Sequence, residues 1–229
     1  MPMPLRPCPC VFTAAMGLDG VVKSWTAVIP VKALDAAKTR LGLPGDPRRP
    51  EFALAFALDV ISACLTSAAV SQVIVVTDDL DVITSATGVT LCAEPPGGGL
   101  NEAIRSGAAM CAGPVVALAG DLPCLTPQAL DYVLALAEAH ESSVLSDTQG
   151  SGTAMLFAGD SQFLDPRFGV GSRAAHVQSG CVDLALDVPA NVRTLLAGAR
   201  RDVDTPADLW DAMRIGVGAN TGAVLGRQS

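Results

Sequence analysis

The chain has 229 residues, a length that fits one α/β domain with a substantial core. Its hydrophobic content of 50% is high, yet no run approaches the roughly 20 uninterrupted apolar residues of a membrane span. The net charge of −8, without a basic stripe, argues against a nucleic-acid partner. Seven cysteines without a CxxC pair or zinc spacing predict free thiols in a reducing cytoplasm.

The two ends of the chain differ from its centre. Residues 1–24 are rich in Pro and lack periodicity, and their short apolar patch is unlike a signal peptide. We expect this segment to be a disordered leader or an over-long start, with Met16 or Val22 as the alternative start. We expect a single domain over 25–215 and a C-terminal tail over 216–229.

In chain order the pattern alternates between strands and helices. Short β-branched runs predict strands, and apolar residues at helical spacing predict helices. The predicted strands cover 25–31, 72–77, 89–93 and 143–146, and a further strand starts at Val115. The predicted helices cover 33–41, 51–69, 82–86 and 101–111, the last capped by Asn101, and two more open at Thr126–Pro127 and Thr205–Pro206. This alternation predicts a doubly wound α/β fold with a mostly parallel sheet.

Three aspartates are placed to meet at the carboxyl edge of this sheet. The apolar run from Val115 leads to Asp121, and a second extended stretch ends in Asp202 and Asp204. Side chains alternate along a strand, so Asp202 and Asp204 point to the same face. Ligands of α/β folds bind at this edge, and carboxylate oxygens suit Mg²⁺ that carries a nucleotide's phosphates. Alone, Asp121 could brace a turn and Asp204 could support a helix cap, but the three together favour a metal site.

The loop after the first strand concentrates positive charge. It holds Lys32, Lys38 and Arg40, in a chain with only three lysines. Loops at this position cradle phosphates in α/β folds, which favours an anion-binding role for Lys32. For Arg40 taken alone, a solvated helix face is the simpler interpretation.

Three small-residue segments are further candidates for anion binding. Gly99 and Asn101 follow a glycine-rich turn at a predicted helix start, although such a turn also suits a plain surface loop. Residues 150–154 and 168–172 combine glycines with hydroxyls, so that N–H and O–H groups can surround a phosphate or a carboxylate. For His176, which follows, a structural role is the first interpretation and catalysis the second.

Taken in order, these motifs resemble the guanylyltransferases of coenzyme F-420 biosynthesis. The resemblance runs from about residue 25 to 209 and is carried by segments 30–32, 37–41, 99–101, 120–123, 152–153, 168–172 with His176, and 202–206. It implies a nucleotide-diphospho-sugar-transferase-like (Rossmann-like) fold. It also implies transfer of GMP from GTP to a small phosphorylated three-carbon acid. Ala154 and segment 165–167 resemble the actinobacterial branch, which is associated with phosphoenolpyruvate rather than 2-phospho-L-lactate.

The resemblance also implies roles for single residues. The residues expected to bind the acceptor are Thr153, Gly169, Ser172 and Lys32. The residues expected to bind the nucleotide are Lys38, Arg40, Gly99 and Asn101. The residues expected to hold Mg²⁺ as the cofactor are Asp121, Asp202 and Asp204. The expected partners are GTP and the acid, with no nucleic acid and no membrane. A homodimer stays open.

Other functions remain open at this point. The same transfer could use 2-phospho-L-lactate or 3-phosphoglycerate. Asp202 and Asp204 also have the spacing of the metal motif in sugar-nucleotide glycosyltransferases, but Asp121 and the two small-residue loops suit a compact anionic acceptor better. The non-enzymatic alternative is a nucleotide sensor, and the intact carboxylates argue against it.

Overall fold

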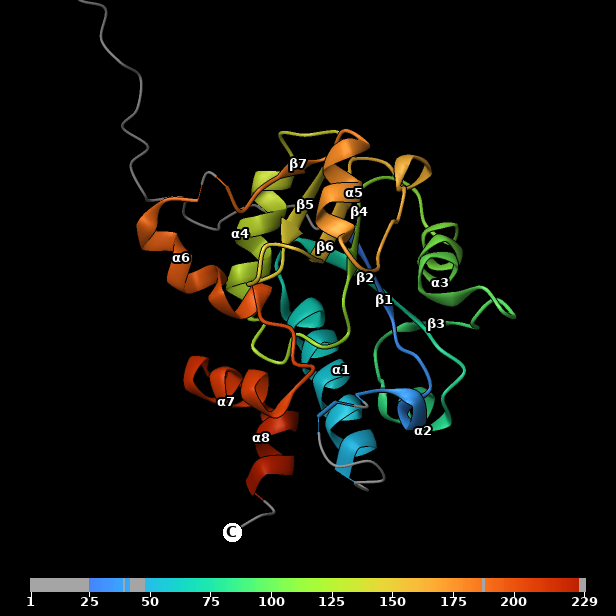
Figure 1. Ribbon diagram of the computed structural model, residues 1–229. Helices are drawn as coiled ribbons and strands as arrows, with labels where there is room; N and C mark the ends of the chain where they lie inside the picture. The colour runs from blue at the N-terminus through green and yellow to red at the C-terminus, as the bar shows by residue number, and fades with distance from the viewer. Residues whose placement is uncertain (1–24, 39, 42–47, 187, 227–229) are drawn as a thin grey trace, which may run out of the picture.

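The computed structural model describes residues 25–38, 40–41, 48–186 and 188–226. Within this part of the chain, seven strands form one sheet in the order β3-β2-β1-β4-β6-β5-β7, with helices on both of its faces (Figure 1). The strands are β1 (Trp25–Pro30), β2 (Val70–Val76), β3 (Thr90–Cys92), β4 (Val115–Leu118), β5 (Ser142–Ser146), β6 (Thr153–Ala158) and β7 (Val182–Asp183). The expected doubly wound α/β fold with a mostly parallel sheet is confirmed. The expected leader, 1–24, lies outside the described residues.

The helices alternate with these strands. They are α1 (Arg48–Thr66), α2 (Leu80–Ser85), α3 (Gly99–Ala108), α4 (Pro127–Ala137), α5 (Ser172–Gln178), α6 (Ala190–Ala197), α7 (Pro206–Ile215) and α8 (Ala219–Gly226). Short 3₁₀ turns lie at η1 (Leu34–Ala36), η2 (Ser161–Phe163) and η3 (Gly198–Arg200). None of the helices among the described residues is long and apolar enough to cross a membrane. The described cysteines are free thiols, as predicted.

Strand β6 is the one strand of the described sheet that runs against its neighbours. Leu118 at the end of β4 pairs with Met155, and Ser146 at the end of β5 pairs with Thr153. The beginning of β6 therefore lies at the edge where the parallel strands end. This reversal brings Thr153 to the edge at which α/β folds generally bind their ligands. The sequence patterns predicted neither β6 nor β7.

Strand β1 is buried on both of its faces, which explains its continuous apolar run. Ala27 and Ile29 pack into the cluster that contains the inner residues of α1 and α4, while Val28 packs with Ile104 of α3 on the opposite face. Each fully buried branched side chain stabilises the fold by about 1.5–3 kcal/mol. The sheet is thus a rigid platform for the residues at its edge.

Two expected helices differ from the sequence-based prediction. The helix expected over 33–41 is reduced to η1, because Lys38 has a positive φ of 53°, which a right-handed helix excludes. The helix expected to be capped by Asn101 begins earlier, at Gly99, with Gly98 at the N-cap position. Asn101 therefore lies in the first turn of α3 and does not cap it.

The segment expected to be a C-terminal tail, 216–229, contributes helix α8. Asp59, buried in α1, explains this, because its carboxylate accepts the backbone N–H groups of Asn220 and Thr221 at 2.9 and 3.0 Å. These bonds satisfy free donors in the first turn of α8. Val224 then packs into a cluster with residues of α1 and α7. Figure 1 shows α8 beside these two helices.

Both expected Thr–Pro helix starts are confirmed. Thr126 Oγ1 accepts the N–H of Ala129 at 3.2 Å. Thr205 and Asp208 form a reciprocal capping box at the start of α7. The box fixes the end of the segment that carries Asp202 and Asp204.

Helix α3 approaches the sheet closely through Gly107. A Cβ at this position would lie 2.6 Å from Val28 Cγ1 and 2.8 Å from Val76 Cγ2. We expect Gly107→Ala to lower the free energy of unfolding by about 1–3 kcal/mol in urea titrations, because an extra methyl group overpacks the interface. Gly222→Ala in α8 is the control, since a Cβ there meets nothing within 4 Å, and it should be neutral or stabilising by about 0.5–1 kcal/mol. Equal stability of the two variants would contradict this account.

Candidate active site

The site is built where β4 ends. Asp121 follows this strand, and Asp202 and Asp204 lie in the extended segment before α7. Val203 N donates to Asp121 O at 3.1 Å, which ties the two segments together. Val203 is fully buried, so its neighbours Asp202 and Asp204 lie toward solvent, half-buried and exposed respectively. The structure thus brings the three predicted carboxylates to one place.

Lys38 supplies positive charge to this group. Its Nζ lies 2.5 Å from Asp121 Oδ2 and 2.8 Å from Asp204 Oδ1. Burial favours the neutral amine, but the charges of Asp121 and Asp204 outweigh it and raise the pKa of Lys38 above its ordinary value. Lys38 is therefore charged at neutral pH and lies among the carboxylates rather than in open solvent.

The pKa of the Asp202 carboxyl is shifted by burial and by the neighbouring carboxylates. Burial, followed by the neighbouring carboxylate of Asp121, raises the pKa of Asp202 to about 6, and this value includes smaller contributions from Asp147 and Asp204. Asp121 Oδ1 is buried and has no hydrogen-bond partner among the described residues. A buried carboxylate oxygen without a partner costs free energy unless a cation or donor reaches it.

These aspartates fit a divalent cation by their chemistry. All three offer hard oxygen ligands, and Asp121 Oδ1 is buried and unpartnered. In the part of the chain that the structure describes, no group of three or more His, Cys, Asp or Glu side chains is arranged to hold a metal ion. The ammonium of Lys38 lies between Asp121 and Asp204 and supplies the counter-charge there.

Two small-residue loops lie side by side beyond the carboxylates. Arg173 N, at the start of α5, donates to Ser151 O at 3.3 Å and joins the loop before β6 to the loop before α5. Thr153 and Ser172 are the first residues of β6 and α5, and both are buried. Gly169 O accepts the N–H of Ser172 at 3.1 Å. The structure therefore brings Thr153, Gly169 and Ser172 into one cluster.

Asp147 connects this cluster to the carboxylates. Its side chain accepts the N–H groups of Ser151 and Gly152 at 3.0 and 2.8 Å, and its charge reaches Asp202. Arg200 fixes the backbone here by donating to the carbonyl of Asp147 at 2.7 Å. Sequence reasoning missed Asp147. The available signal was an Asp followed by a Gly-rich turn, a pattern in which the carboxylate binds backbone N–H groups of the turn.

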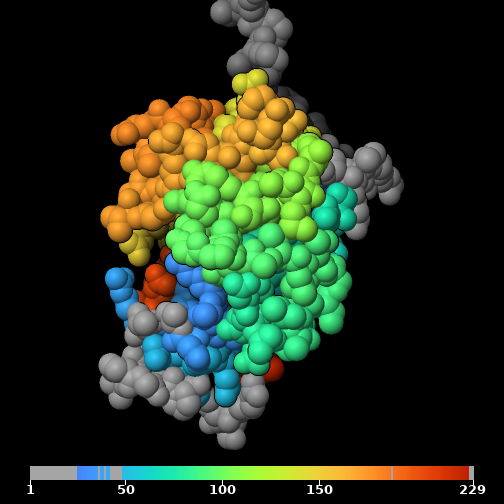
Figure 2. Space-filling model, turned by 90° about the vertical axis from the view of Figure 1, so that its right-hand side faces the viewer, coloured from blue at the N-terminus to red at the C-terminus, as the bar shows by residue number. Residues whose placement is uncertain are grey.

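Asn101 joins α3 to the loop before α5. Its Oδ1 accepts the N–H of Phe168 at 2.8 Å, and its Nδ2 donates to the carbonyl of Phe168 at 3.1 Å. The amide thus holds the loop before α5 against α3. Figure 2 shows these two segments side by side, with the orange segment of α5 and its loop next to the green α3. The predicted contact of Asn101 with a nucleotide stays a prediction.

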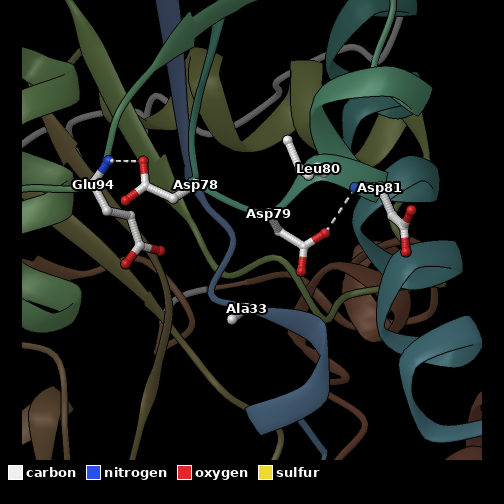
Figure 3. Close-up of a pocket in the computed structure, with 6 residues that line it drawn as sticks. All are labelled: Ala33, Asp78, Asp79, Leu80, Asp81 and Glu94. Atoms are coloured by element: carbon white, nitrogen blue, oxygen red, sulfur yellow. Dashed lines mark hydrogen bonds between the residues drawn. The ribbon is translucent and has the colours of Figure 1, made fainter.

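An open hollow lies beside the end of β1. It is a cleft of about 580 Å³ lined by Ala33, Asp78, Asp79, Leu80, Asp81 and Glu94 (Figure 3). Two of its carboxylates already bind backbone N–H groups: Asp78 accepts from Glu94 at 3.0 Å, and Asp79 accepts from Asp81 at the same distance. Burial and Asp78 raise the pKa of Glu94, while Lys32 opposes them. The cleft is therefore strongly acidic.

The remaining predicted residues border this cleft or lie in the open. Lys32 is exposed, and its charge reaches Glu94, which places it near the cleft. Arg40 is exposed as well. Gly99 has a φ of 69°, and a Cβ there would meet nothing within 4 Å. Their predicted substrate contacts stay predictions.

The sequence matches the CofC-like guanylyl transferases over residues 25–225. The chain belongs to this family. A phosphoenolpyruvate guanylyltransferase from Streptomyces coelicolor is 45% identical over 211 residues, which cover 89% of this chain and 96% of the relative. The family expected from the motifs is confirmed.

Solved structures with low sequence identity share the fold. A nucleotide-diphospho-sugar transferase from Desulfovibrio desulfuricans superposes with a TM-score of 0.65 at 17% identity, covering 90% of this chain and 95% of the other. Rv0371c from Mycobacterium tuberculosis, in complex with manganese, superposes with a TM-score of 0.51 at 21% identity, covering 84% and 98%. The expected nucleotide-diphospho-sugar-transferase-like fold is confirmed.

The raised pKa of Asp202 predicts a pH-dependent stability. A carboxyl whose pKa is higher in the folded state than in the unfolded state stabilises the fold at low pH, and this contribution is lost as the pH rises from about 4 through 6. We expect Asp202→Asn to be more stable than the wild type at pH 7.5 in the presence of a chelator. This advantage should shrink as the pH falls toward 4, because the amide cannot ionise.

Thermal unfolding of both proteins across this pH range measures the difference. Asp35→Asn is the matched control, since Asp35 is exposed on η1, and it should follow the wild type at each pH. An Asp202→Asn protein that is less stable than the wild type at pH 7.5 would contradict the crowding of these carboxylates.

Proposed function

We propose that this chain transfers GMP from GTP to phosphoenolpyruvate and releases pyrophosphate, in the cytoplasm and in coenzyme F-420 biosynthesis. The observation that carries the proposal is one continuous site, in which Asp121, Asp202 and Asp204 adjoin the Thr153–Ser172 cluster through Asp147. Charged phosphates and a compact anionic acceptor need these two features side by side. Membership of the guanylyl transferases and the names of the relatives support this choice.

The chemistry needs no strong base and no covalent enzyme intermediate. The acceptor's phosphate is already an anion, and one of its oxygens attacks the α-phosphorus of GTP in line. A new P–O bond forms as the bond between the α-phosphorus and the bridging oxygen breaks, and pyrophosphate leaves with the electron pair. The enzyme's work is to position the two anions and to neutralise their charge.

We assign Asp121, Asp202 and Asp204 as ligands of Mg²⁺. The buried, unpartnered Asp121 Oδ1 supports this assignment, and a protein of the same fold is described in complex with manganese. When bound, the metal ion neutralises phosphate charge at the reacting groups. Lys38 then has the triphosphate as its partner in place of Asp121 and Asp204, together with the exposed Arg40.

The acidic cleft suits the guanine base rather than the phosphates. Its carboxylates repel phosphate groups, but they accept hydrogen bonds from N–H donors. Guanine presents N1–H and N2–H₂ next to each other, a pair of donors that adenine, cytosine and uracil lack. Glu94 is the candidate acceptor, because Asp78 and Asp79 already bind backbone N–H groups. Gly99 follows on the same segment and leaves open space for the nucleotide.

The acceptor acid is assigned to Thr153, Gly169 and Ser172, and the family resemblance adds Lys32 to this set. Backbone N–H and hydroxyl groups of two adjoining loops can surround a phosphate or a carboxylate. The connection of these loops through Arg173 and Ser151 supports the assignment.

A substrate screen tests the proposal. The protein is stripped with a chelator and then assayed for pyrophosphate release with GTP, ATP, CTP or UTP, each with phosphoenolpyruvate, 2-phospho-L-lactate or 3-phosphoglycerate. We expect turnover with GTP and phosphoenolpyruvate after Mg²⁺ is restored, and none in Asp121→Asn. A preference for CTP, or consumption of a nucleotide sugar in place of GTP, would contradict the proposed activity.

Ser172 provides a test of the acceptor site. Loss of a hydrogen bond to a charged group costs about 1.5–3 kcal/mol, so Ser172→Ala should lower kcat/KM for the acceptor by about ten- to a hundred-fold. The KM for GTP should change little. Ser62→Ala, on the exposed face of α1, is the control and should match the wild type. A raised KM for GTP with an unchanged acceptor KM would mean that the loops bind the other substrate.

A further inference from the structure

His176 lies fully buried beneath the acceptor cluster. Its Nδ1 is 2.9 Å from Thr153 Oγ1, and its Nε2 is 2.9 Å from the backbone N of Arg167. The ring also packs edge-on against Phe168, with the ring centroids 5.3 Å apart. One imidazole therefore joins the start of β6 to the loop before α5.

The Arg167 contact determines which ring nitrogen carries the proton. A backbone N–H can only donate, so His176 Nε2 must accept and is unprotonated. A neutral imidazole then has its single proton on Nδ1. Nδ1–H donates to Thr153 Oγ1, because a hydroxyl oxygen can accept.

Because Thr153 Oγ1 accepts a hydrogen bond from His176 Nδ1–H, the Thr153 hydroxyl can donate its own proton to another acceptor. His176 Nδ1 is the hydrogen-bond partner that the structure gives Thr153 Oγ1 among the described residues. A hydroxyl that accepts from one side donates to the other. Its proton is thus available to an oxyanion in the cluster of Thr153, Gly169 and Ser172.

We infer that His176 is a positioning residue that holds the Thr153 hydroxyl as a hydrogen-bond donor to the acceptor's anionic oxygen. The inference rests on the proposed function in that the oxyanion is taken to be the phosphorylated acid. His176 does not touch the substrate and moves no proton in the reaction. Its effect passes through Thr153 alone.

The surroundings of the ring keep it neutral. Burial lowers the pKa of His176; Asp165 opposes this and Arg167 adds to it, and the carbonyl of Ser172 also faces the ring and favours the protonated form. The second proton of an imidazolium would point at the N–H of Arg167, which cannot accept it. The geometry and the electrostatics agree on the neutral form.

Nitrogen NMR of the ¹⁵N-histidine-labelled full chain tests the tautomer without substrates. The sequence has only two histidines, so a His140→Gln variant assigns the signals. We expect one protonated nitrogen, Nδ1, and one unprotonated nitrogen, Nε2, in His176 at pH 7.5. A protonated Nε2 at this pH would overturn the inference, whatever the activity of the protein.

Two substitutions separate the two hydrogen bonds of the ring. Asn places an amide N–H₂ where Nδ1–H lies, and Gln places an acceptor oxygen where Nε2 lies. Because about 1.5–3 kcal/mol is lost with a hydrogen bond to a charged group, His176→Gln should raise the acceptor KM by about ten-fold or more. His176→Asn should keep this KM within about three-fold of the wild type and instead lower the thermal stability, since Arg167 N is left unpaired.

Double variants with Thr153→Val complete the test. Removing the hydroxyl should raise the acceptor KM, while Thr153→Ser should restore it. His176→Gln added to Thr153→Val should cause no further loss, because both act through the same hydroxyl. Additive losses in the double variant would overturn the inference and assign His176 a general structural role. An acceptor KM unaffected by Thr153→Val, with the predicted tautomer intact, would instead contradict the proposed acceptor site.

Discussion

Repulsion between carboxylates is the constraint around which the catalytic edge is organised. Asp121, Asp202 and Asp204 are held together by backbone contacts that do not depend on their charges, chiefly the bond from Val203 N to Asp121 O. The fold therefore imposes the crowding, and the side chains must find compensation. Lys38 provides part of it, and burial together with the charge of Asp121 still raises the pKa of Asp202. Because these carboxylates repel one another, a bound cation reduces their repulsion, so this edge of the sheet favours cation binding.

The reversed strand β6 gives this edge its second half. In an all-parallel sheet, a strand next to β4 would begin at the far edge, away from the carboxylates. Because β6 is antiparallel, its first residue, Thr153, lies beside the end of β5. Asp147 then binds the loop before β6 and lies near the carboxylates. His176 joins Thr153 to the loop before α5, and Asn101 holds that loop against α3. The three aspartates and the cluster of Thr153, Gly169 and Ser172 thus adjoin each other.

Much of the fold could be predicted from the sequence, because apolar strand segments and Thr–Pro helix starts are local signals. The convergence of the three aspartates could also be predicted, since the carboxyl ends of parallel strands share an edge of the sheet. Other features depend on distant contacts. Segment 33–41 is rich in helix-forming residues, but the ion pairs of Lys38 with Asp121 and Asp204 accompany a left-handed backbone that ends the turn. The direction of β6 and the amide contacts of Asn101 leave no trace in local patterns.

The loop before β6 contains two glycines that the fold needs for opposite reasons. Gly150 has a φ of 72° with open space around it, so an L-residue at this position would be disfavoured by its backbone conformation and not by a clash. Gly152 has no such φ, but a Cβ at this position would lie 2.5 Å from Asp147 Oδ2, so a larger residue would be disfavoured by a steric clash. A D-alanine would therefore suit position 150 better than an L-alanine does, whereas no choice of chirality at 150 relieves the crowding at 152. A rotation of the Asp147 carboxylate or a shorter side chain at 147 would relieve it, and either change would remove the link between the two halves of the site.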